Sequence, residues 1–225
     1  MGKIIVTGES RIEREPDTVE VFANLWKVCR EYDEALLESQ RAAELLRDIL
    51  AKEGFLAGDL KTTGFSVSTE YESFEEQGAY RQRISGYRYS HSLKLSFDFD
   101  RERLGRILRA LSESPDNPEL SIGYTVKSGN AVRDRLIKDA VKDAKKKAAA
   151  MASAAGLKIT GISEISCHDP RPVVNTGAVR CNMGGMGALL RGKSTAEDST
   201  AAFAAGIVPE NITAQDSVTV VFETE

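Results

Sequence analysis

The chain has 225 residues, of which 41% are hydrophobic and 28% charged, with a formal net charge of −4. This composition is ordinary for a folded protein and excludes a disordered chain, a collagen and a coiled-coil rod. The small acidic excess excludes a global positive field that would draw the chain to nucleic acid or anionic lipid. No stretch approaches the roughly 18 consecutive apolar residues of a membrane-spanning segment.

The spacing of apolar residues predicts the elements of the first part of the chain. Strands are expected at 3–7 and 18–28, and a helix with one apolar stripe at 33–53. The second strand is apolar on both faces, which predicts a central strand covered on two sides. Trp26 in that strand is therefore expected to be largely buried between the sheet and a helix.

A long hairpin follows, with strands at 62–71 and 84–97. Acidic residues before its turn face basic residues after it, and each such pair across antiparallel strands favours one register by about 0.2–1 kcal/mol. The strands are longer than the usual length of about five or six residues, so the hairpin is predicted to extend beyond the core. A second helix is expected at 100–112 and a short strand at 120–127.

The third helix, 132–155, is the clearest element, and its inner face is mostly alanine in the second half, which permits a close approach to a sheet. Strands are expected at 159–166 and 212–223, and the strands near the two chain ends are expected to share one sheet. Between them, 168–209 is rich in Gly, Pro, Asn and Ser and is predicted to be an irregular Gly/Met-rich loop.

The order of these elements, ββαββαβαββ, predicts an α+β fold. Three main helices are expected to pack on a mixed, largely antiparallel sheet from which the long hairpin extends. The whole chain, 1–225, is interpreted as a single domain.

One segment matches a phosphate-binding pattern. Gly187, Gly192, Lys193 and Ser194 satisfy G-x-x-x-x-G-K-[ST]. A true phosphate-binding loop of this kind needs a buried strand directly before it and a helix directly after it. The flanking residues indicate neither, so the segment is interpreted as a flexible loop. A nucleotide- or phosphate-binding protein that uses this segment is the alternative function.

The sequence nominates no catalytic residue, cofactor or metal site. The adjacent Cys167, His168 and Asp169 cannot form a catalytic set, because consecutive side chains diverge. His91 lies on the apolar face of its strand and is expected to be partly buried with one hydrogen-bond partner. The chain is therefore not expected to be an enzyme.

The compartment is predicted from the cysteines and the first residues. Cys29, Cys167 and Cys181 are an odd number without close spacing, which indicates no disulfide framework and fits a reducing compartment. The apolar run after Met1 is too short for a signal-peptide core. A cytoplasmic protein is expected, with a periplasmic or extracytoplasmic one as the alternative if a signal peptide was trimmed.

The third helix is also the most basic element. Over 131–155 it carries seven Lys and Arg residues against three Asp residues. A solvated helix face is favoured, because aromatic residues and a known nucleic-acid motif are absent from the sequence of this helix. Nucleic-acid binding through the helix is a weaker alternative.

Several segments together resemble the SIMPL-domain family, through their order and spacing rather than through any one motif. They are Ile5–Glu9, Glu15–Thr18, Thr63–Ser66, Ile84–Arg88, Asp139–Ala148 with Ala155–Gly156, and Ser217–Glu223. The resemblance implies an α+β fold, no established enzymatic activity or cofactor and, for some members, a large ring-like or channel-like homo-oligomer. Bacterial members include periplasmic immunogenic proteins and relatives linked to oxidative-stress tolerance.

The favoured function is a non-enzymatic, self-assembling protein with a role in the stress response or the cell envelope. Its expected partner is a second copy of the chain. The predicted association elements are the long charged hairpin and the Gly/Met-rich segment 183–187. The charged, tyrosine-rich tip of the hairpin is expected to join subunits, because interfaces favour tyrosine and opposite charges on a neighbour can pair with the tip. The candidate assembly residues are Tyr71, Glu75, Glu76, Tyr80, Arg81 and Arg83.

Overall fold

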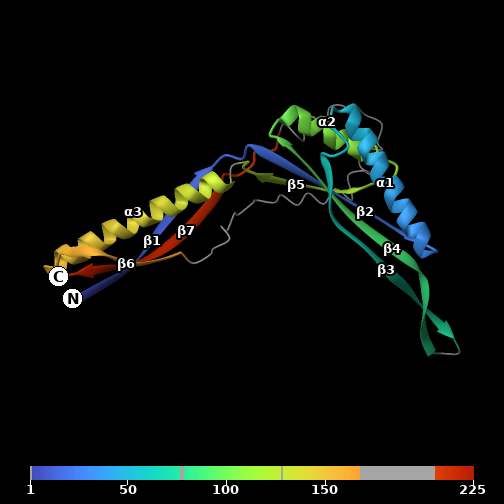
Figure 1. Cartoon of the computed structure of the whole chain (residues 1–225). Coiled ribbons are helices and arrows are strands. Elements are labelled where there is room, and N and C mark those ends of the chain that lie inside the picture. The colour runs from blue at the N-terminus through green and yellow to red at the C-terminus, as the bar shows by residue number, and fades with distance from the viewer. Residues whose placement is uncertain (1, 77–78, 128, 168–205) are drawn as a thin grey trace. The chain divides into compact units, whose positions relative to one another are not determined.

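Figure 1 shows the computed structural model of the chain, which describes residues 2–76, 79–127, 129–167 and 206–225. Contacts within the chain divide these residues into two compact units. The terminal unit comprises the described residues of 1–17, 125–177 and 209–225, so it contains both ends of the chain. The central unit comprises the described residues of 18–124 and 178–208.

The terminal unit is a three-stranded antiparallel sheet with one long helix packed on it. Its elements are β1 (Gly2–Arg14), α3 (Gly129–Ala155), β6 (Ile159–Cys167) and β7 (Ile212–Thr224). The strand order is β1-β7-β6. β1 pairs with β7 along its whole length, from Gly2 opposite Thr224 to Arg14 opposite Ile212. The prediction that the strands near the two chain ends share a sheet is therefore confirmed.

Small side chains bring α3 close to this sheet. Ala140, Ala144, Ala148 and Ala152 follow one face of the helix and are buried against the apolar face of β1 and β7. Gly8 of β1 lies so close to the helix that a Cβ added there would stand 2.6 Å from the Ala144 nitrogen and 2.8 Å from the Ala144 Cβ. The predicted close approach of the alanine face to a sheet is confirmed, and it depends on small residues on both partners.

α3 also protects the open edge of β1, which is an edge strand of its sheet. The Lys147 ammonium donates to the Thr7 carbonyl at 3.1 Å, and the Glu9 backbone N–H donates to Asp143 Oδ2 at 3.0 Å. The hydrogen bonds from Lys147 and from the Glu9 N–H hold the pKa of Asp143 below its ordinary value. These bonds occupy backbone groups that an edge strand otherwise offers to another strand.

The central unit is a four-stranded sheet with two helices on one of its faces (Figure 1). Its strand order is β3-β4-β2-β5. Its elements are β2 (Thr18–Cys29), α1 (Tyr32–Lys52), β3 (Leu60–Glu76), β4 (Ala79–Asp98), α2 (Arg101–Ser112) and β5 (Glu119–Thr125). Val21 and Leu25 of β2 and Leu93 and Leu95 of β4 point into the core between the sheet and the helices and are almost completely buried.

The predicted element order and the α+β class are confirmed. The strands form two sheets, however, where the sequence predicts one. Several strands are also longer than predicted: β1 continues to Arg14 because all of it pairs with β7, and the hairpin strands reach Glu76 and Ala79 because they pair with each other. Backbone pairing extends a strand into residues whose side chains show no apolar alternation.

The prediction that Trp26 is largely buried is wrong, because its side chain is 45% exposed. β2 is an inner strand, as predicted, but the helices cover only the face that carries Leu25. On the other face, the Trp26 indole N–H donates to Glu119 Oε1 at 2.8 Å, and the Arg88 guanidinium lies 4.4 Å from the ring centroid. Polar neighbours therefore take the place of the second apolar layer that the sequence suggests.

Candidate assembly surface

The hairpin of β3 and β4 continues past the sheet as a two-stranded ribbon. β4 pairs with β2 only from Tyr87 to Asp98, whereas it pairs with β3 from Leu95 back to Ala79. Residues 70–76 and 79–86, here called the ribbon, therefore have only each other as strand partners. Figure 1 shows the ribbon extending beyond α1. The predicted extension of the hairpin beyond the core is thus visible in the central unit.

Gly86 lies where the ribbon leaves the sheet. A Cβ at this position would collide with the carbonyl oxygen of Cys29, the last residue of β2, and would stand 3.0 Å from Val28 Cγ1. The pairing also shifts register next to this point, between Glu70 and Tyr71. A glycine and an irregular pairing therefore permit the ribbon to pass the end of β2 and continue alone.

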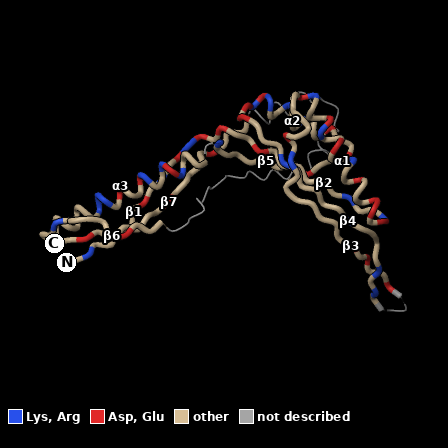
Figure 2. Tube along the Cα trace, in the orientation of Figure 1, with Lys and Arg blue, Asp and Glu red and all other residues tan. Residues whose placement is uncertain are grey.

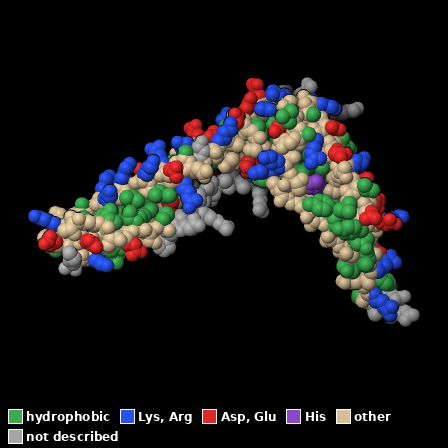
Figure 3. Space-filling view, viewed as in Figure 1, with side chains coloured by type: hydrophobic (Ala, Val, Ile, Leu, Met, Phe, Trp, Pro, Cys, Tyr) green, Lys and Arg blue, Asp and Glu red, His purple; other side chains and the backbone are tan. Residues whose placement is uncertain are grey.

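Large apolar side chains are exposed on the ribbon. Tyr80 is 82% exposed, Tyr71 59% and Ile84 56%. Figure 3 shows hydrophobic side chains gathered on the surface over β3 and β4. Tyrosine combines apolar area with a polar tip and is enriched where proteins meet one another.

The charged residues of the ribbon are partly engaged within it. Arg83 forms an ion pair with Glu72, its partner across the strands, and its guanidinium lies 5.1 Å from the centroid of the Phe74 ring. Arg81 is likewise engaged in an interaction. The Glu72–Arg83 pair is of the kind expected to favour the register of the hairpin. The charges therefore act first within the ribbon.

The structure separates the six candidate assembly residues into groups. Tyr71, Glu75 and Tyr80 have exposed side chains, whereas Arg81 and Arg83 have interaction partners. The side chain of Glu76 lies outside the part that the structure describes. Sequence reasoning missed Ile84, the first residue of the predicted strand 84–97, which is exposed on the ribbon. Only the length of β2, which ends at the level of Tyr87, reveals that Ile84 has no third strand beside it.

His91 is placed as predicted, on the core-facing side of β4, and it has two hydrogen-bond partners rather than one. Its Nδ1 lies 3.0 Å from the Ser39 hydroxyl and its Nε2 lies 2.9 Å from the Thr62 hydroxyl. The Phe65 ring meets the imidazole edge to face at 5.4 Å between centroids. Burial lowers the pKa of His91 below its ordinary value, and the positive charge of Arg47 acts in the same direction.

This environment predicts a loss of stability in mild acid. Because the pKa of His91 is lower in the folded than in the unfolded chain, the unfolded chain binds more protons as the pH falls through about 6.5, and folding weakens there. Urea unfolding at pH 7.5, 6.0 and 5.0 should show a smaller fall for His91→Gln than for the wild type. Equal falls, or an imidazole that titrates above pH 6.5 by NMR, would contradict this assignment.

The described residues contain no cluster of three or more His, Cys, Asp or Glu side chains that could hold a metal ion. Cys29 is a buried thiol whose pKa is raised by burial, and Cys167, at the end of β6, is exposed. Cys181 lies outside the described residues, as do His168 and Asp169. No helix in the described part of the chain is long and apolar enough to cross a membrane.

The basic residues of α3 alternate with acidic ones along the helix, as Figure 2 shows. Asp139 pairs with Lys142 at 3.1 Å and with Arg135 at 3.7 Å, and Asp143 pairs with Lys147 at 2.8 Å. These ion pairs reduce the positive charge that a phosphate backbone would meet. They support a solvated helix face rather than a nucleic-acid site.

The phosphate-binding pattern at Gly187, Gly192, Lys193 and Ser194 lies outside the described residues. The predicted loop 168–209 lies outside them too, apart from its last four residues.

Two antiparallel sheets with three helices define an α+β protein. The model of the SIMPL family, described as a protein of unknown function (DUF541), matches residues 4–222 of the chain. The chain therefore belongs to the SIMPL family, and the resemblance inferred from its segments is confirmed.

Two curated relatives are each 26% identical to the chain over 226 residues. Both are named 26 kDa periplasmic immunogenic protein, one from Brucella melitensis biotype 1 and the other from Brucella abortus strain S19. Each comparison covers 98% of this chain and 84% of the relative. Among solved structures, CutA from Synechococcus elongatus PCC7942 matches with 17% identity and a TM-score of 0.21, covering 58% of this chain and 95% of CutA.

Proposed function

We propose that this chain is a non-enzymatic protein of the periplasm that assembles with copies of itself and serves the cell envelope or the stress response. The compartment is supported by the names of the two Brucella relatives, which are periplasmic proteins. It replaces the cytoplasmic location that the cysteines and the first residues suggest.

The ribbon is the observation that carries the proposal of self-assembly. It has exposed backbone edges on both strands, and within the described residues it exposes Tyr71, Tyr80 and Ile84. An open strand edge beside apolar side chains binds another chain by strand addition or by side-chain packing. A second copy fits this role, because it supplies the same aromatic and charged groups in a symmetric contact.

The charges of the ribbon are partly paired within one copy and add little to the strength of this contact. Arg83 is held by Glu72 and Phe74, whereas Glu75 is exposed. Because these opposite charges already pair within one copy, the exposed apolar side chains supply most of the contact energy. We therefore place the main assembly contact on Tyr80 and Ile84.

Light scattering coupled to size-exclusion chromatography tests this contact. The wild type should elute as an oligomer, and the double variant Tyr80→Ser/Ile84→Ser should fall toward the 24.5 kDa mass of one chain. Both side chains are exposed, so the far-ultraviolet circular dichroism of the variant should stay native.

Ile165→Ser is the matched control, because Ile165 of β6 is 54% exposed but lies in the terminal unit. Its mass should equal that of the wild type. A monomeric wild type would remove the proposal of self-assembly. If the oligomer survives in the double variant, or if Ile165→Ser disrupts it equally, the ribbon is not the contact between copies.

A further inference from the structure

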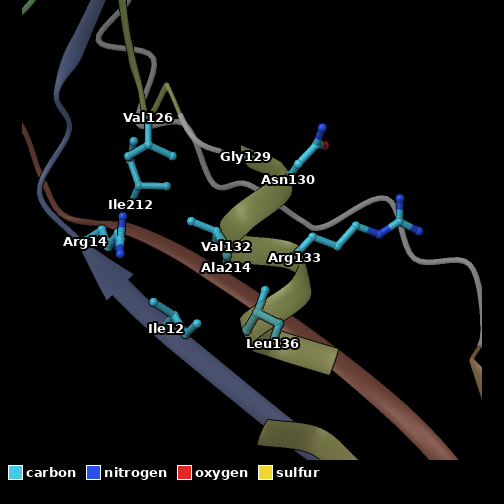
Figure 4. Close-up of a pocket in the computed structure, with 10 residues that line it drawn as sticks. All are labelled: Ile12, Arg14, Val126, Gly129, Asn130, Val132, Arg133, Leu136, Ile212 and Ala214. Carbon is cyan, nitrogen blue, oxygen red and sulfur yellow. The ribbon is translucent and has the colours of Figure 1, made fainter. Parts of the chain in front are cut away.

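A cavity of about 260 Å³ lies in the terminal unit, at the end where β1 finishes and α3 begins. Its apolar walls come from both strands, the helix and the segment before the helix: Ile12, Val126, Val132, Leu136, Ile212 and Ala214. Figure 4 shows these side chains converging from β1, β7 and α3. The cavity is therefore a hydrophobic site that opens at one end of the unit.

The cavity follows from a change of residue size along α3. Farther along the helix, the alanines from Ala140 onward lie directly on the sheet. At the start of the helix the inward positions are Val132 and Leu136, and the facing residue of β7 is the small Ala214. Larger side chains on the helix and a small one on the strand leave space that the neighbouring groups do not fill.

The charge at this site has one sign. Two of the residues around the cavity are arginines, Arg14 and Arg133, and none is acidic. Figure 4 shows Arg14 beside Ile212, whereas Arg133 extends away from the apolar side chains. The Arg14 side chain is exposed at the cavity, and within the described residues it forms no ion pair with a carboxylate.

We propose that this cavity binds a single-chain alkyl carboxylate, with the alkyl chain between α3 and the sheet and the carboxylate on the Arg14 guanidinium. The volume equals that of about nine water molecules at about 30 Å³ each, and a methylene group is of similar size. It therefore holds one chain of roughly eight to ten carbon atoms and not the two chains of a membrane phospholipid. Guanidinium and carboxylate pair through two parallel hydrogen bonds.

Isothermal titration of the full chain with decanoate below its micelle concentration tests the proposal. Saturable binding of one decanoate per chain is expected. Decylamine, which has the same alkyl chain and a positive head group, should bind at least about tenfold more weakly. Absence of saturable decanoate binding, or equal affinity for decylamine, would overturn the proposal.

Three variants locate the site. Arg14→Gln should weaken decanoate binding about tenfold, because it removes the charged hydrogen bond between the guanidinium and the carboxylate. The Arg14 side chain is exposed, so the substitution should leave the core intact. Ala214→Leu should fill the cavity and abolish binding while circular dichroism stays native. Arg11→Gln is the control, because the Arg11 guanidinium on the same strand is held by Glu13 at 2.6 Å. Unchanged affinity in Arg14→Gln, or equal losses in Arg14→Gln and Arg11→Gln, would show that Arg14 is not the anchor.

Sedimentation with phosphatidylglycerol vesicles tests whether the ligand is a free carboxylate or a lipid within a membrane. The protein should remain in the supernatant. Co-sedimentation that Arg14→Gln abolishes would overturn the single-chain ligand, because the site would then bind a membrane surface. Neither result depends on the oligomer mass, so this site and the ribbon are tested separately.

Discussion

Gly8→Ala is expected to destabilise the terminal unit by about 3 kcal/mol, at the upper end of the usual cost of overpacking. The added methyl group would collide with the Ala140 carbonyl oxygen and stand 2.6 Å from the Ala144 nitrogen. Both atoms belong to the backbone of α3, so no side chain can turn aside to make room. The helix would have to move off β1, and the hydrogen bond from the Glu9 N–H to Asp143 would break with it.

Urea unfolding followed by far-ultraviolet circular dichroism measures this loss. Gly161→Ala is the matched control, because the nearest atom to its new Cβ is a Glu223 carboxylate oxygen at 3.8 Å, at the end of a flexible side chain. The control should unfold within about 0.5 kcal/mol of the wild type. A Gly8→Ala variant as stable as Gly161→Ala would show that α3 does not pack on β1 as closely as described.

Leu93→Ala is expected to destabilise the central unit by about 2–5 kcal/mol. Leu93 is completely buried, and it lies on β4 between Ala23 of β2 and Thr62 of β3. Truncation removes three carbon atoms from the middle of the core and leaves a cavity that the strands on both sides cannot close. Leu56→Ala is the control, because Leu56 is an exposed leucine of the same unit.

The single tryptophan of the chain reports on this unit alone. Trp26 is held by Glu119 and Arg88, so its emission should change when the central unit unfolds. Leu93→Ala should lower the urea midpoint of the fluorescence transition, whereas Leu56→Ala should not. An unchanged midpoint in Leu93→Ala would contradict the burial of Leu93.

The two variants together decide how the chain unfolds. Because the terminal and central units have separate hydrophobic cores, Gly8→Ala should shift the circular dichroism transition and leave the fluorescence midpoint in place. If 1–225 is instead one cooperative domain, as the sequence predicts, each variant shifts both signals equally.

The candidate surface could be predicted only in part. The length of the hairpin and its charged, tyrosine-rich tip are visible in the sequence, and the structure shows the ribbon that they predict. That Arg83 is held by Glu72 and Phe74 depends on the register of β3 against β4. The exposure of Ile84 depends on where β2 ends. Contacts between segments distant in the sequence decide both, and residue type alone does not specify them.

The sequence by itself determined the elements, their order and the face that α3 turns to its core, because local periodicity encodes these features. It also determined the start of α2, where the Asp100 carboxylate accepts hydrogen bonds from the backbone N–H groups of Glu102 and Arg103. Only the tertiary structure decided that the strands form two sheets and that Trp26 is exposed. Strand partners and the layer that covers an apolar face come from residues far apart in the chain, so no local pattern records them.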